Sequence, residues 1–117
     1  MMAYSTSEIS EALNTINATI TNCEKMLGKF DENTSQHSLL INRIQALKTS
    51  KGVITSTEYY DKIQLEEALP PIESIINKSS KAQIKHNKES STYKRLQKHI
   101  HAMKIAQFFI YADLKNK

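Results

Sequence analysis

The residues best suited to chemistry in this sequence are cations, and they are concentrated in its last third. Residues 78–117 carry ten Lys or Arg and two Asp or Glu, whereas residues 1–77 carry six and ten. Ammonium groups and protonated imidazoles hold phosphates and carboxylates by Coulomb attraction and charge-assisted hydrogen bonds. We therefore expect an anion-binding surface, whose candidate residues are Lys81, Lys85, Ser91, Lys94, Lys98, His101 and Lys104.

The spacing of these residues supports one shared surface. Lys94, Lys98 and His101 are three to four residues apart, so they lie on the same face of a helix. Ser91 adds a hydroxyl donor to the cations. The alternative interpretation is a solvated basic face, partly neutralised by the acidic first two thirds of the chain or by a neighbouring chain.

A metal site is not expected. His99 and His101 are two residues apart, which on a helix turns their side chains about 200° away from each other, so they cannot hold one ion together. The remaining histidines, His37 and His86, have no partner at a metal-ligand spacing. We interpret all four as structural or surface residues.

Nucleophilic catalysis is also not expected. Cys23 lies between Ile20 and Leu27 on an apolar stripe, which predicts a buried structural thiol. No GxSxG, P-loop or GxGxxG motif is present, and two glycines cannot build a phosphate-cradling loop. We expect a protein that is not an enzyme and needs no cofactor.

The elements that position the cations come in two copies. When the chain is shifted by 56 residues, residues 11–54 match residues 67–110 at 13 of 44 positions, against roughly three expected by chance. The matches include the lysine pairs Lys25/Lys81 and Lys29/Lys85. We predict a single domain, 1–117, with one repeat over about 5–56 and a second over about 61–114.

Each repeat has the pattern of a helical hairpin. A capping-box pair, Ser5 and Glu8, precedes an apolar stripe with alternating spacings of four and three that runs from Ile9 to Phe30. A polar turn at 31–34 leads into a second helix over about 35–54. In the second copy, the corresponding helices end near residue 86 and span about 91–114, with a turn at 87–90.

These helices predict the fold class. The absence of Trp and the scarcity of Gly and Pro are typical of a helical protein. Two hairpins with one-sided apolar stripes are most simply buried against each other, which predicts an all-α, antiparallel four-helix bundle. Pro70 and Pro71 remove two amide donors, so the third helix should be kinked or broken there.

The sequence carries a few indications of compartment. Cys23 is the single cysteine, so no internal disulfide can form, and a reduced cytoplasm is expected. The N-terminus lacks the pattern of a signal peptide, and no apolar run approaches the length of a membrane span. We expect a cytoplasmic protein without a membrane partner.

The half-repeat has a recognisable pattern: E-A-L-x-x-I-x-x-x-I, then Lys, then S-[QT]-[HY], then L-x-x-x-I-x-A-[LM]-K. This pattern resembles a module of short uncharacterised proteins from phages and Firmicutes. In size and build the chain is also similar to small helical phage proteins that sequester cyclic-nucleotide immune signals, and to bacteriocin immunity proteins. The resemblance to the phage proteins that sequester cyclic-nucleotide signals implies a nucleotide-like ligand and an anti-defence role.

Taken together, these features predict a non-enzymatic binding protein that sequesters a nucleotide-like anionic ligand. The alternative is a protein-interaction module, acting as an inhibitor or immunity factor on an acidic protein surface or a second copy of the chain. Its docking residues would be Tyr59, Tyr60, Phe108, Phe109 and Tyr111. A third hypothesis, weak non-specific binding of nucleic acid, is not preferred because aromatics are not interleaved with the cations.

Overall fold

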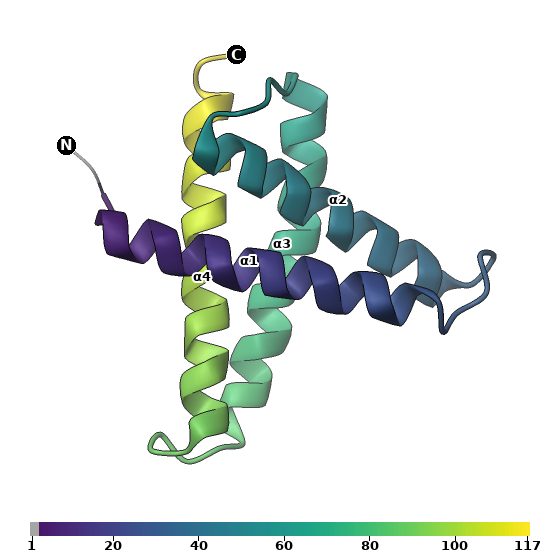
Figure 1. The fold of residues 1–117 in the computed structure, drawn as a ribbon, viewed down its shortest axis with the longest axis vertical. Coiled ribbons are helices and arrows are strands. Elements are labelled where there is room, and N and C mark those ends of the chain that lie inside the picture. Colours follow the sequence, from purple (N-terminus) through teal and green to yellow (C-terminus); the bar gives the residue numbers. More distant parts are fainter. Residues whose placement is uncertain (1–2) are drawn as a thin grey trace.

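The structure is a computed structural model that describes residues 3–117. It consists of four helices, α1 (Thr6–Leu27), α2 (Ser35–Thr55), α3 (Lys62–Ile84) and α4 (Ser91–Leu114), with no strand among the described residues. Figure 1 shows that α1 runs antiparallel to α2 and that α3 runs antiparallel to α4. The predicted all-α four-helix bundle of two antiparallel hairpins is confirmed.

The helices begin at equivalent positions of the two repeats. Ser5 and Thr34 cap α1 and α2, and the residues 56 positions later, Asp61 and Ser90, cap α3 and α4. Each cap side chain accepts a hydrogen bond from the backbone amide three residues on, which satisfies a donor that the helix leaves unpaired. The duplication therefore extends to the local signals that start each helix.

Pro70 and Pro71 lie inside α3, which continues through them from Lys62 to Ile84. Of the two predicted alternatives, a kink or a break, the break is excluded. The prolines deprive the carbonyls of Glu66 and Glu67 of their helical amide donors. Glu66, Glu67 and Pro70 are exposed, so water can reach this part of the helix and reduce the cost.

The two hairpins cross instead of lying side by side (Figure 1). The molecule measures 39 × 38 × 19 Å, which is a flat cross about two helices thick. Beyond the crossing, the closed end of each hairpin projects as an arm. We call residues 22–42 the first arm and residues 78–98 the basic arm.

The core lies at the crossing and draws equivalent residues from both repeats. α2 contacts α3 and α4, and α1 contacts α4, whereas no Cα atom of α1 lies within 8 Å of one in α3. The fully buried side chains there, with exposures below 2 %, include Ile16, Leu47, Leu65, Ile72, Met103, Ile105 and Ile110. Ile16 and Ile72 are repeat equivalents, as are Leu47 and Met103. A smaller cluster of Cys23, Leu40 and Ile44 closes the first arm.

Gly52 is a position at which the two repeats pack differently. It is buried in α2, and the ring of Tyr60 lies directly against it. A Cβ atom at this position would come within 2.7 Å of Tyr60 Cε2 and closer still to the Tyr60 hydroxyl. Tyr60 also donates a hydrogen bond of 3.4 Å to the carbonyl of Lys48, so the ring is held in this notch.

Replacement of Gly52 by alanine should therefore lower the free energy of unfolding by about 1–2 kcal/mol, because overpacking outweighs the ~1 kcal/mol that alanine gains in helix propensity. Gly28→Ala is the matched control, since nothing lies within 4 Å of a Cβ there. The free energy of unfolding of the Gly28→Ala protein should equal or exceed that of the wild type. Urea unfolding of both variants measures the difference, and a Gly52→Ala protein as stable as Gly28→Ala would contradict the packing described here.

Candidate functional site

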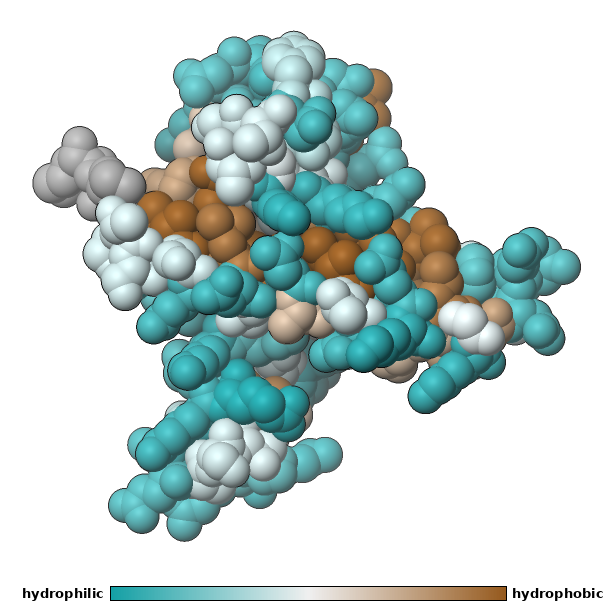
Figure 2. Space-filling view, viewed as in Figure 1, coloured by the Kyte–Doolittle hydropathy of each residue, from teal (hydrophilic) through white to brown (hydrophobic). Residues whose placement is uncertain are grey.

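The basic arm contains most of the predicted anion-binding residues. It carries seven Lys or Arg and one Asp or Glu, whereas the equivalent residues of the first arm carry two and three. The cations of the basic arm are all exposed: Lys78, Lys81, Lys85, Lys88, Lys94, Arg95 and Lys98. Figure 2 shows the lower arm of the cross covered mainly by hydrophilic residues. Among residues 3–117, none of these cations lies within 4.0 Å of a carboxylate.

The seven predicted site residues divide into three groups. Lys81, Lys85, Ser91 and Lys94 lie on the open surface of the basic arm. Lys98 and His101 line a cavity of about 190 Å³ between α1 and α4, together with Glu11, Asn14 and Thr15. Lys104 is exposed on α4 beyond the arm. The chain therefore brings these residues onto one hairpin, but only Lys98 and His101 share a cavity.

His101 is already engaged by α1. Its Nε2 lies 3.0 Å from Glu8 Oε2, and its ring meets that of Tyr4 edge-on at 5.9 Å. Tyr4 in turn packs against Phe108 at 5.4 Å. The pKa of Glu8 is held below its usual value, chiefly by the hydrogen bond from the Ser5 amide and then by the hydrogen bond to His101. The anion that His101 holds is thus a carboxylate of the same chain.

A second groove, of about 700 Å³, lies between α2 and α3 and is the repeat equivalent of this cavity. Every residue that lines the smaller cavity has its equivalent, 56 positions away, in the lining of this groove: Glu67, Ala68, Pro70, Pro71, Asn42, Gln45 and Ala46. Neutral Asn42 and Gln45 replace Lys98 and His101. Tyr60 is the repeat equivalent of Tyr4, and its ring packs against Gly52. The repeat equivalent of Gly52 is the bulky Phe108. The larger groove is therefore more open, and its charged lining residues are Lys48 and Glu67.

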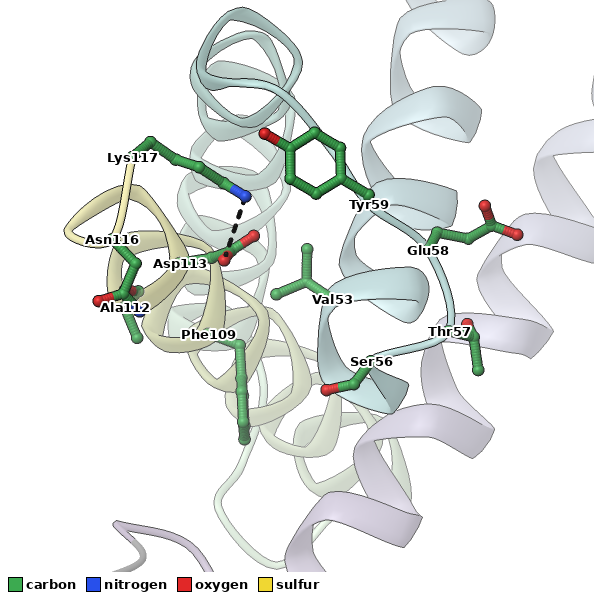
Figure 3. A pocket seen from close by; sticks show the side chains of 10 residues that line it. All are labelled: Val53, Ser56, Thr57, Glu58, Tyr59, Phe109, Ala112, Asp113, Asn116 and Lys117. Carbon is green, nitrogen blue, oxygen red and sulfur yellow. Dashed lines mark hydrogen bonds and ion pairs between the residues drawn. The ribbon is translucent and has the colours of Figure 1, made fainter.

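The predicted aromatic docking residues are dispersed. Tyr59 and Phe109 line a cavity of about 500 Å³ near the end of α4 (Figure 3), where Lys117 Nζ lies 4.0 Å from the centre of the Tyr59 ring. Tyr60 instead lines the groove between α2 and α3. Phe108 and Tyr111 are 44 % and 52 % exposed on α4. These five residues therefore do not all line one cavity or groove.

Cys23 and the possible metal ligands are the remaining candidates for chemistry. Cys23 is buried, as predicted, and burial raises the pKa of its thiol. Within residues 3–117, no three His, Cys, Asp or Glu side chains are grouped so as to hold a metal ion. In the same range, no helix combines the length and apolar character that crossing a membrane requires.

Arg43 is the residue that sequence analysis missed. Its Nε and Nη2 atoms are buried without a hydrogen-bond acceptor in the described part of the chain. Buried donors left in this state cost about 1–3 kcal/mol each. The repeat equivalent of Arg43 is His99, whose pKa is lowered by burial and then by the charges of Arg95 and Arg43. The only sequence signal was the presence of cationic side chains at the same position of both repeats.

No family model, no curated protein and no solved structure matches the chain. The functional argument therefore rests on the residues themselves.

The link between Glu8 and His101 predicts a pH dependence of stability. Because the pKa of Glu8 is lowered on folding, its stabilising effect is present above its ordinary value of 4.5 and is lost as the pH falls through the lowered pKa. Glu8→Gln preserves the capping box but removes the charge. Its melting temperature should lie below that of the wild type at pH 7, and the difference should shrink as the pH falls through the lowered pKa of Glu8.

Glu11→Gln provides the control, because Glu11 lies on the same helix and lines the same cavity but forms no ion pair among residues 3–117. Its melting temperature should differ from that of the wild type by a similar amount at every pH. A Glu8→Gln difference that stays constant from pH 7 to pH 3 would show that the carboxylate does not contribute through its charge.

Proposed function

We propose that this chain is a non-enzymatic binding protein that engages a phosphate-bearing partner with its basic arm. The observation that supports this most is the difference in charge between two arms of the same origin. The first arm has two Lys or Arg and three Asp or Glu, which gives a net charge of −1. The basic arm has seven Lys or Arg and one Asp or Glu, which gives a net charge of +6. Equivalent helices and caps form in both. The cations of the basic arm are therefore not needed to build an arm.

Keeping seven exposed cations close together has a physical cost. Like charges repel one another, and no carboxylate of the described chain lies within 4.0 Å of these cations to reduce the repulsion. A partner that carries negative charge removes this repulsion when it binds. Lysine ammonium groups on flexible stems suit phosphate oxygens, which accept hydrogen bonds from several directions.

The shape of the arm indicates what kind of phosphate-bearing partner fits. Lys81, Lys85 and Lys94 lie on an open surface, so they cannot enclose a single phosphate. Several phosphates spaced along the arm can each meet a different lysine. The smallest partner of this kind is a nucleotide-like ligand with two or more phosphates, in keeping with the sequence prediction, and a nucleic-acid strand is a longer one.

The repeat provides a matched pair of variants to test this. Lys81→Gln with Lys85→Gln removes two cations of the basic arm, and Lys25→Gln with Lys29→Gln removes the two equivalent cations of the first arm. Binding of a fluorescent cyclic dinucleotide and of a labelled single-stranded oligonucleotide can be followed by anisotropy. We expect the first variant to weaken binding about tenfold, which corresponds to about 1.4 kcal/mol, and the second to change it no more than about twofold.

The two labelled partners separate a small ligand from a polymer. If the polymer is the partner, its affinity should fall steeply with salt, because each phosphate contact releases counterions. Equal losses in the two variants would show that net charge alone matters. No binding of either partner to the wild-type protein would refute the proposal.

A further inference from the structure

We propose a separate oxyanion-binding site, formed by Arg43 of α2 with Arg95 and His99 of α4. The site lies where the basic arm joins the crossing, but it depends on none of the lysines discussed above. It goes beyond the proposed function, since it can exist even if the arm binds nothing.

The first observation concerns the orientation of the Arg43 donors. The unpaired atoms, Nε and Nη2, are neighbours on one edge of the planar guanidinium group. This edge is the one that donates two parallel hydrogen bonds to a pair of oxygens on a carboxylate or phosphate. An arginine that packed only through its aliphatic stem would leave the head group in water, where every donor is hydrated. Arg43 instead holds its bidentate edge inside the protein.

The second observation is the charge around this edge. His99 is partly buried, which lowers its pKa, and the charges of Arg95 and Arg43 lower it further, so both guanidinium groups of the chain act on this imidazole. Arg43 also acts on Cys23 of α1. The acid that follows Cys23, Glu24, forms an ion pair with Lys48 at 3.7 Å. Among residues 3–117, Arg43 has no carboxylate partner of its own.

The third observation is the position of the site in the duplicated fold. Arg43 and His99 are repeat equivalents, and they lie on α2 and α4, which contact each other. The charge of Arg43 acts on His99, so the two copies of this position influence each other across the two repeats. The site can form only from both repeats, and a single hairpin would not contain it.

These observations point to a ligand with two oxygens in one plane and a negative charge. A phosphate group and a carboxylate both satisfy this description. A metal ion does not, because two of the three side chains are guanidinium groups, which have no electron pair to offer a metal. Binding would place the anion against the Nε/Nη2 edge and offset the positive charge of Arg43.

The experiment uses the fact that the chain has only two arginines. A ¹⁵N spectrum of arginine side chains should therefore contain two Nε–H signals, and Arg95→Lys leaves only that of Arg43. The wild-type protein is titrated at pH 7 and constant ionic strength with sodium phosphate, with sodium acetate and with sodium chloride. We expect the Arg43 signal to shift and saturate with phosphate or acetate but not with chloride. The anion that saturates the shift at the lower concentration is the preferred ligand.

Thermal unfolding gives an independent readout. The preferred anion should raise the melting temperature of the wild type by a few degrees through mass action. Arg43→Met should melt higher than the wild type without the anion, because it no longer buries unpaired donors, and it should lose the anion-dependent rise. Arg43→Lys is the second variant: it keeps the charge but lacks the planar fork, and it should lose most of the rise as well.

Lys81→Gln with Lys85→Gln separates this site from the basic arm. That variant should keep both the Arg43 shift and the anion-dependent rise, even though its binding of nucleotides or oligonucleotides is weakened. The inference is wrong if neither anion produces a saturable shift of the Arg43 signal. It is equally wrong if Arg43→Met retains the full rise in melting temperature.

Discussion

The packing of the two hairpins at their crossing is the interaction on which the rest of this structure depends. Each hairpin alone would leave an apolar stripe in water, and an isolated pair of helices is marginal at this length. The crossing buries those stripes against each other through α2 and α4, where Leu47 and Met103 are fully buried. Truncation of one such side chain to alanine typically costs about 2–5 kcal/mol, a large share of the stability of a small domain.

The crossing also explains why the two arms can differ so much. Because the core is confined to the centre, the end of each hairpin is held by contacts within that hairpin, such as those of Cys23, Leu40 and Ile44 in the first arm. Surface residues there can change without disturbing the centre. The same logic applies to the paired grooves beside the crossing, where Pro70, Pro71 and Gly52 give one copy a shape that the other lacks.

Local and repeated features of the structure could be predicted from the sequence. The apolar stripe from Ile9 to Phe30 and the pair of Ser5 with Glu8 predicted α1, and the shift of 56 residues predicted the second hairpin. The way the hairpins meet could not be predicted, because the angle depends on how side-chain ridges fit across two helices. Ala46 and Ala102, both buried at the centre, permit a close approach there that periodicity alone does not indicate.

The same limit applied to the candidate sites. Spacing along one helix placed Lys94, Lys98 and His101 on one hairpin surface, but it could not reveal that His101 would pair with Glu8, which is 93 residues away. It also could not identify Arg43, because unpaired donors are defined by everything that surrounds them. Such a site arises from the meeting of two repeats and leaves almost no trace in either one.

The central claim, that two copies of one hairpin cross, is tested most directly by a distance between the arm tips. Spin labels at Asp31 and Lys88, both exposed, can be measured by pulsed electron resonance in a Cys23→Ser background, since serine occupies the equivalent position 79. A crossed arrangement predicts a separation well above two helix diameters, about 20 Å. A distribution centred below that value, as in an aligned bundle with both turns at one end, would contradict the account.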